Sequence, residues 1–148
     1  MDDTPEDKQY LDAMVLLYSA MGLSAKGDYD EAILRYGIAL TVLEELQGSD
    51  KAGRFSSDKM YPTLLALRAD AYKEKGDYER ALADYDGSIA RMPDHVRAYT
   101  GRADLYERMG DRSRAIADFQ KALDLNPNML PQYVEECKQA LKRLGTMH

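Results

Sequence analysis

The sequence has little of what most catalytic and metal-binding sites need. Its 148 residues include one cysteine and two histidines. Cys137 alone cannot form an internal disulfide, and a lone cysteine is more often a small buried apolar residue than a nucleophile. His95 and His148 are too far apart in the sequence for a metal site of familiar spacing. We therefore expect no enzyme activity, no metal site and no cofactor.

Long apolar runs and an excess of positive charge are also absent. The longest apolar run, Ala13 to Leu17, is far shorter than the roughly 20 residues that cross a bilayer. The net charge is −6, whereas nucleic-acid affinity depends on clustered lysine and arginine. The first ten residues, MDDTPEDKQY, are acidic where a secretory signal would be basic and then apolar. These features predict a cytoplasmic protein that binds neither membranes nor nucleic acid.

What the sequence does contain is an internal repeat. The stretch KEKGDYERALADYD, residues 73–86, returns 34 positions later as ERMGDRSRAIADFQ, residues 107–120. Self-similarity at a fixed period of this length indicates stacked supersecondary units. Small and apolar residues recur at helical spacing on both sides of the Gly–Asp pair in each copy. Each unit is therefore predicted to be a pair of helices.

The Gly–Asp pair predicts the turn between the two helices. Gly76 and Gly110 stand where the first helix must stop, because glycine readily adopts the left-handed conformation that closes a helix. Asp77 and Asp111 follow as N-caps of the second helix. A proline 17 residues after each glycine then ends that helix.

The residues around the turn predict how the helices pack. Small residues such as Ala69 and Ala81 let the two helices of a hairpin approach closely, while Tyr85 fills the space between units. A repeated arginine is expected to cover apolar neighbours and to pair with an aspartate of the second helix. The two predicted pairs are Arg68 with Asp84 and Arg102 with Asp118.

A third copy lies earlier in the chain, and the three copies together resemble the tetratricopeptide repeat. The earlier copy is SAKGDYDEAILRYGIAL, residues 24–40, in which Asp28 and Glu31 resemble a capping box. The matching residues are Leu65, Ala69, Tyr72, Gly76, Ala81, Tyr85, Ser88 and Pro93 in the middle copy, and Tyr99, Ala103, Tyr106, Gly110, Ala115, Phe119, Ala122 and Pro127 in the last. The first copy departs from the pattern, because Leu23 replaces the aromatic residue and Glu44 the proline.

The resemblance implies an all-α fold: a right-handed superhelix, or α-solenoid, of three helical hairpins plus a C-terminal capping helix. The expected single domain spans residues 1–148, with repeats at about 13–47, 62–95 and 96–129, and the capping helix at about 130–144. The helix that begins near Tyr29 runs on through TVLEELQ, and a loop follows at about 48–59. Ser57 or Asp58 is the expected cap of the next helix. A similar insertion is seen in immunophilin co-chaperones.

The resemblance also places function in a concave groove that the first helices line, where such proteins hold extended or helical peptides. Ala66, Thr100 and Gly101 are expected to leave room for a ligand backbone. The implied groove residues are Met14, Leu17, Tyr18 and Met21 in the first copy, Thr63, Ala66, Leu67, Asp70 and Lys73 in the second, and Arg97, Thr100, Gly101, Asp104 and Arg108 in the third.

The best-known ligand of this groove in the family is the acidic C-terminus of heat-shock chaperones, held by a clamp of lysines, asparagines and an arginine. The matching positions here are Leu17, Met21, Leu67, Arg97 and Gly101. Only Arg97 fits that role, and one guanidinium does not replace several convergent charged donors. The sequence therefore argues against clamp-type binding.

The sequence is compatible with two functions. The first is a protein-binding module, an adaptor or co-chaperone-like scaffold, whose peptide partner offers apolar side chains to Met14, Leu17, Met21 and Leu67 and a basic group to Asp70 and Asp104. The second is an assembly protein that self-associates as a homo-oligomer through the capping helix or the exposed helix of the first repeat. The alternative to the first function is that the chain's own N-terminal segment or a second copy covers Met14, Leu17 and Met21.

Overall fold

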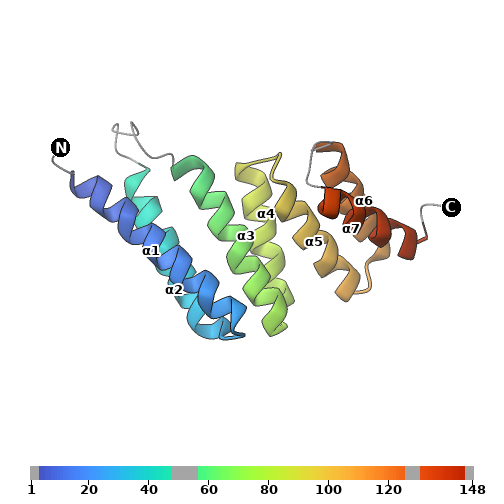
Figure 1. Cartoon of the computed structure of the whole chain (residues 1–148), viewed down its shortest axis with the longest axis horizontal. Coiled ribbons are helices and arrows are strands. Elements are labelled where there is room, and N and C mark those ends of the chain that lie inside the picture. Colours follow the sequence, from blue (N-terminus) through green and yellow to red (C-terminus); the bar gives the residue numbers. More distant parts are fainter. Residues whose placement is uncertain (1–3, 48–56, 126–130, 146–148) are drawn as a thin grey trace.

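The computed structural model describes residues 4–47, 57–125 and 131–145, and over these ranges the chain forms seven α-helices and no strand. Consecutive helices pair as hairpins that stack in sequence order, and the last helix closes the C-terminal end (Figure 1). The helices are α1 (Pro5–Ala25), α2 (Tyr29–Leu46), α3 (Ser57–Lys75), α4 (Tyr78–Arg91), α5 (Val96–Arg108), α6 (Arg112–Leu125) and α7 (Pro131–Arg143). The predicted all-α helical repeat is confirmed. Most of the predicted 48–59 loop, and Pro127, lie outside the described residues.

The turns between paired helices form as predicted. Gly27, Gly76 and Gly110 have φ angles of 86°, 92° and 81°, in the left-handed region that residues with a Cβ rarely adopt. The Asp77 carboxylate accepts a hydrogen bond from the backbone N–H of Arg80 at 3.3 Å. Asp111 caps α6 in the same way, since it accepts from the N–H of Arg114 at 3.2 Å.

The predicted capping box of the first repeat is wrong. The Asp28 side chain makes no capping hydrogen bond, and Glu31 instead accepts from Arg35 at 3.1 Å. A capping box does form one helix earlier, at the start of α1. The Asp7 N–H donates to the Thr4 hydroxyl at 3.1 Å, while the Thr4 N–H donates to the Asp7 carboxylate at 3.0 Å. With a proline at the first helical position, this box starts α1 well before residue 13.

The helix α3 also begins earlier than the repeat pattern predicts. Its first residue is Ser57, so Ser57 and Asp58 lie in its first turn and do not precede it as caps. Pro62 lies inside the helix, where it has no N–H for the helical ladder. Its carbonyl accepts a buried hydrogen bond from the Ser88 hydroxyl of α4 at 2.7 Å. Pro62 thus links the first part of α3 to the last part of α4.

The apolar core consists of three clusters, and each joins a hairpin to the helix that follows it. The large side chains Tyr36, Tyr85 and Phe119 occupy equivalent positions in the three second helices and are all buried. Alanines surround them, including Ala69, Ala81, Ala103 and Ala115, which are fully buried. The predicted alternation of small and large residues is confirmed, and it lets successive hairpins stack without gaps.

The two predicted arginine–aspartate pairs are present and bidentate. Arg68 donates to the two oxygens of Asp84 at 2.7 and 2.8 Å. Arg102 donates to both oxygens of Asp118 at 2.7 and 2.9 Å, which raises the pKa of Arg102. These planar pairs lock the first helix of a hairpin to the second. In the first repeat, a hydrogen bond from Arg35 to Ser19 takes their place.

His95 has a structural role between the second and third repeats. Its Nδ1 accepts from the N–H of Ala98 at 3.3 Å and so caps α5. Burial lowers its pKa, and the nearby positive charge of Arg97 acts in the same direction. The ring is therefore held neutral, the form that can accept this bond.

We expect Asp118→Ala to lower the free energy of unfolding by about 2 kcal/mol, because the Arg102 guanidinium loses a partly buried bidentate partner. Urea denaturation followed by circular dichroism measures the change. Asp124→Ala is the matched control, since Asp124 is an exposed aspartate near the end of the same helix. Equal losses in the two variants would contradict a structural role for the arginine–aspartate pair.

Candidate functional site

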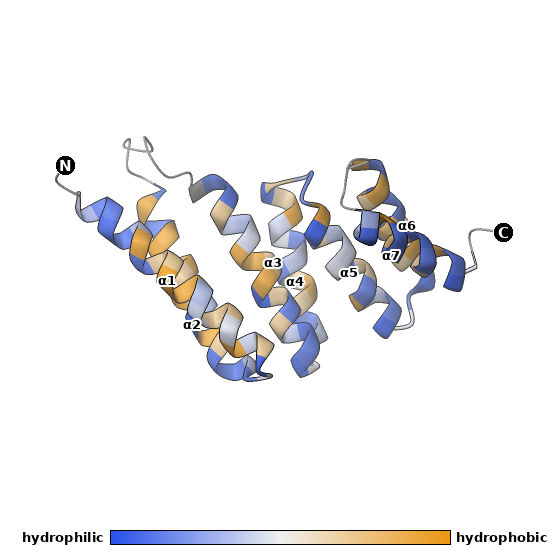
Figure 2. Cartoon of the chain, viewed as in Figure 1, coloured by the Kyte–Doolittle hydropathy of each residue, from blue (hydrophilic) through white to orange (hydrophobic). Residues whose placement is uncertain are grey.

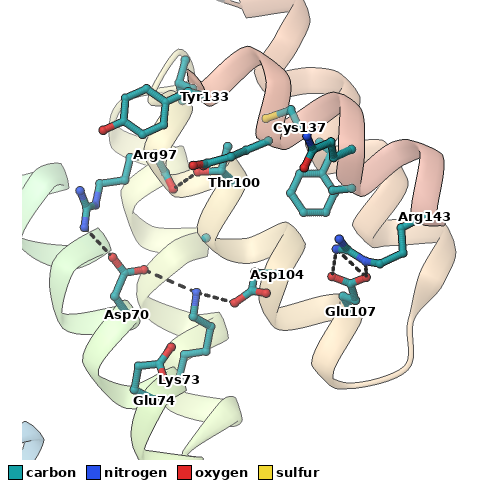
Figure 3. Close-up of a pocket in the computed structure, with 16 residues that line it drawn as sticks. Asp70, Lys73, Glu74, Arg97, Thr100, Asp104, Glu107, Tyr133, Cys137 and Arg143 are labelled. Carbon is teal, nitrogen blue, oxygen red and sulfur yellow. Dashed lines mark hydrogen bonds and ion pairs between the residues drawn. The ribbon is translucent and has the colours of Figure 1, made fainter. Parts of the chain in front are cut away.

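A cavity of about 830 Å³ lies between α3, α5 and α7 (Figure 3). A second cavity of about 250 Å³ lies between α1, α2 and α3. Asp70, Glu74 and Arg97 line both cavities, so the two lie side by side along the first helices of the hairpins. We call the two cavities together the groove.

Helical spacing explains which side chains reach the groove. On α3, Leu67, Asp70 and Glu74 follow one another at three- and four-residue intervals and so lie on one face. On α5, Arg97, Gly101 and Asp104 follow the same spacing. The capping helix α7 supplies the remaining wall.

A network of ion pairs forms the floor of the groove (Figure 3). Arg97 Nη2 lies 3.0 Å from a carboxylate oxygen of Asp70. Lys73 Nζ lies 3.0 Å from Asp104 Oδ2 and 3.9 Å from Asp70 Oδ1. Because Lys73 is buried, it is a bridge between α3 and α5 and not a free cation. Asp104 also forms an ion pair with Arg108, at 3.2 Å.

Tyr85 connects this floor to the core. Its ring is fully buried and its hydroxyl donates to Asp70. The ammonium group of Lys73 lies over the same ring, 5.8 Å from its centroid. Burial, together with the negative charge of Asp70, raises the pKa of Tyr85, so the phenol stays protonated and donates.

The expectation that Ala66 and Gly101 leave room for a ligand backbone is wrong. Ala66 is fully buried in the core cluster that contains Tyr85. A Cβ atom built on Gly101 would lie 2.6 Å from the Tyr85 ring. The space that glycine leaves is therefore filled by the protein's own tyrosine, and of the three residues only Thr100 is both groove-lining and partly exposed.

The α7 wall contributes residues that the repeat pattern did not identify. Arg143 pairs with Glu107 of α5 at 2.8 Å, which ties α7 across the end of the groove. Tyr133 is exposed on the groove side, while Cys137 is buried. Burial raises the pKa of the Cys137 thiol. The sequence predicted α7 only as a capping helix and placed none of its residues in the groove.

Eight of the fourteen predicted groove residues line the two cavities: Met21, Leu67, Asp70, Lys73, Arg97, Thr100, Gly101 and Asp104. The other six, Met14, Leu17, Tyr18, Thr63, Ala66 and Arg108, line neither cavity. Leu17 is buried against α2 and α3, and Tyr18 is exposed. Arg108 lies at the groove rim, since it pairs with the lining residue Glu74 at 2.8 Å.

Within the described ranges, no three or more His, Cys, Asp or Glu side chains form a cluster able to hold a metal ion. In the same part of the chain, no helix has the length and apolarity needed to span a membrane.

Comparison with known families and structures bears on this architecture. The sequence model described as tetratricopeptide repeat matches residues 67–146. The chain belongs to the tetratricopeptide repeat family. The curated proteins include no match.

Solved tetratricopeptide repeat (TPR) domains share the fold. The OM64 TPR domain of Arabidopsis is 22% identical with a TM-score of 0.72, over 92% of this chain and 96% of that one. The Sgt2 TPR domain of Aspergillus fumigatus is 22% identical with a TM-score of 0.70, over 95% and 78%. The second TPR domain of human RPAP3, solved with the HSP70 peptide SGPTIEEVD, is 24% identical with a TM-score of 0.64, over 91% and 97%.

The structure also shows how this TPR domain fills the five clamp positions. Leu17 and Leu67 are buried, and Met21 is an exposed apolar side chain. Arg97 is paired with Asp70, and Gly101 is covered by Tyr85. Acidic peptide termini would find no free cation at these positions.

We expect Gly101→Ala to lower the free energy of unfolding by about 1–2 kcal/mol, because the added methyl displaces the Tyr85 ring and its hydrogen bond to Asp70. Gly87→Ala is the control. A Cβ there meets only ordinary van der Waals contact, 3.5 Å from Leu65, so it should raise stability by about 0.5–1 kcal/mol through helix propensity. Thermal unfolding measures both, and similar shifts in the two variants would refute the close contact at Gly101.

Proposed function

We propose that the chain is a protein-interaction module that holds an extended or helical segment of a partner in the groove, as an adaptor or co-chaperone-like scaffold. The observation that carries this proposal is the pair of adjoining cavities along α1, α3, α5 and α7. Cavities of this size that lie between helices are typical ligand sites. Membership of the TPR family supports a polypeptide ligand.

The groove's charge favours a basic segment over an acidic one. Five carboxylates line the larger cavity, against the three cations Lys73, Arg97 and Arg143. Counting Arg108 at the rim as a fourth cation leaves an excess of one carboxylate, so the groove remains net negative. Most of these groups pair with one another, whereas Glu136 has no cationic partner among the described residues. The five carboxylates are Asp70, Glu74, Asp104, Glu107 and Glu136.

The internal pairing changes the role that Asp70 and Asp104 have in this proposal. Both are already bound to the chain's own cations. A ligand's basic group therefore competes with Arg97 and Lys73 at these carboxylates, and it meets less competition at Glu136. Apolar side chains of the ligand contact Met21 and Tyr133, the exposed apolar residues at the two ends of the groove.

A peptide solved with one structural neighbour is acidic, whereas the segment proposed for this chain is basic. The human RPAP3 domain is solved with SGPTIEEVD, which ends in acidic residues. In this chain the larger cavity presents paired cations and an excess of carboxylates. We therefore propose a partner distinct from such acidic termini.

Fluorescence anisotropy tests this proposal with three labelled peptides: SGPTIEEVD, a ten-residue peptide of leucine and arginine, and its glutamate counterpart. We expect the arginine peptide to bind at least about tenfold more tightly than either acidic peptide, because like charges in the groove oppose the latter. Glu136→Lys should weaken binding of the arginine peptide about fivefold.

Glu135→Lys is the matched control, since Glu135 is the adjacent exposed glutamate of α7 and does not line the groove. The affinity of the Glu135→Lys variant for the arginine peptide should stay close to that of the wild type. Equal losses in Glu135→Lys and Glu136→Lys would contradict the groove as the binding site. Tighter binding of SGPTIEEVD than of the arginine peptide would contradict the proposed ligand charge.

A further inference from the structure

The outer side of the first hairpin carries an exposed apolar surface, distinct from the groove. We call it the N-terminal face and define it by Leu11, Val15 and Tyr18 of α1 with Leu34 and Ile38 of α2. Their exposed fractions are 45%, 67%, 63%, 56% and 45%. Figure 2 shows that apolar residues are concentrated at the α1 and α2 end of the molecule. Single exposed apolar residues are common, but five on one hairpin call for a covering partner.

The five residues form two rows on the adjacent helices of one hairpin. Leu11, Val15 and Tyr18 recur at intervals of four and three, so they share one side of α1. Arg35, between Leu34 and Ile38 in the sequence, donates a hydrogen bond to Ser19 of α1. That polar contact links α1 to α2 between the two rows.

The stacking of the later repeats shows what this side of α1 is shaped to contact. Leu64 of α3 and Ala98 of α5 occupy the positions equivalent to Val15, and each is fully buried in a cluster with the preceding hairpin. In the first repeat the equivalent residue is two-thirds exposed. The N-terminal face therefore has the form of a hairpin-stacking surface with no hairpin of this chain upon it.

The α2 part of the face is particular to the first repeat. The residues equivalent to Leu34 and Ile38 are small or charged in the later repeats: Ala83 and Gly87 in α4, Ala117 and Lys121 in α6. Large apolar residues at these outward positions are thus not a requirement of the repeat. Leu34 and Ile38 therefore enlarge the apolar surface of this hairpin beyond the part that stacking of another hairpin on α1 would cover.

The other end of the molecule does not offer a similar surface. The helix α7 buries Cys137, Ala140 and Leu141 against the third repeat. Its outward positions are mainly charged or amide side chains, among them Glu135, Lys138 and Lys142. The capping helix is therefore excluded as a large apolar contact surface, and a head-to-tail chain of copies is disfavoured.

We propose that the N-terminal face binds the same face of a second copy of this chain, as a two-fold symmetric dimer. With the two α1 helices antiparallel and Val15 near the axis, Leu11 of each copy lies opposite Tyr18 of the other. Five half-exposed side chains at about 100 Å² each supply roughly 500 Å² per copy, or about 1,000 Å² in total. Polar residues at the rim bring this to the lower range of specific dimers. Such a two-fold contact closes on itself.

Sedimentation equilibrium of the full 148-residue chain, from about 5 to about 200 µM, tests the dimer. We expect association of the wild type within this range, and a dissociation constant at least about tenfold higher for Val15→Lys, since two ammonium groups would meet at the axis. Met109→Lys is the control, because Met109 is a similarly exposed apolar residue at the end of α5. It should associate like the wild type.

A second measurement fixes the geometry without relying on a disruptive charge. In a Cys137→Ala background, Val15→Cys should form a disulfide-linked dimer on oxidation, because residues near a two-fold axis approach within disulfide reach. Met109→Cys should stay monomeric. The proposal is overturned if the wild type remains monomeric to about 200 µM. That is also the result expected if a different protein covers the face. A Val15→Lys variant that associates like the wild type would also overturn the proposal.

Discussion

The rest of the structure depends on one contact, the packing of the Tyr85 ring against the bare backbone of Gly101. The ring fills the space between the second and third hairpins, where any side chain at position 101 would collide with it. Its hydroxyl then holds Asp70 in the groove floor. Stacking of the second repeat on the third and placement of Asp70 in the groove are thus set by the same side chain.

This arrangement gives the groove a fixed electrostatic character. Asp70 is held by Tyr85 and accepts from Arg97, while the buried Lys73 reaches across to Asp104. Because these groups are satisfied within the protein, ligand binding does not need to order them first. The cost is that, among the residues that the structure describes, the groove has no free cations of the kind that an acidic chain terminus requires. The N-terminal face adds a separate apolar surface on the far side of the first hairpin.

Local features were the ones that could be predicted from the sequence. Gly76 ends a helix and Asp77 starts the next because the required conformation and hydrogen bond involve only neighbouring residues. The pairing of Arg102 with Asp118 was predictable because the repeat places both at fixed positions. The early start of α1, directly after its cap Thr4, depends on a Thr–Asp variant of the capping box. This variant lies outside the repeat pattern.

The groove was harder to predict because its shape depends on contacts between repeats. Gly101 has the right position to admit a ligand, and only the ring packed from α4 reveals that the space is taken. Tyr18 shares a helix with the groove residue Met21, yet it is turned away from the cavities. The contribution of α7, including Glu136, follows from how the capping helix docks, which no repeat position encodes.

The central claim is that a partner segment lies along the first helices, between α3, α5 and α7. Amide chemical-shift mapping by NMR, with the arginine peptide titrated into the labelled protein, tests it most directly. The account predicts the largest shifts at Glu74, Arg97, Thr100 and Glu136, with little change on the outward positions of α4 and α6. Shifts concentrated on those outward positions would contradict it.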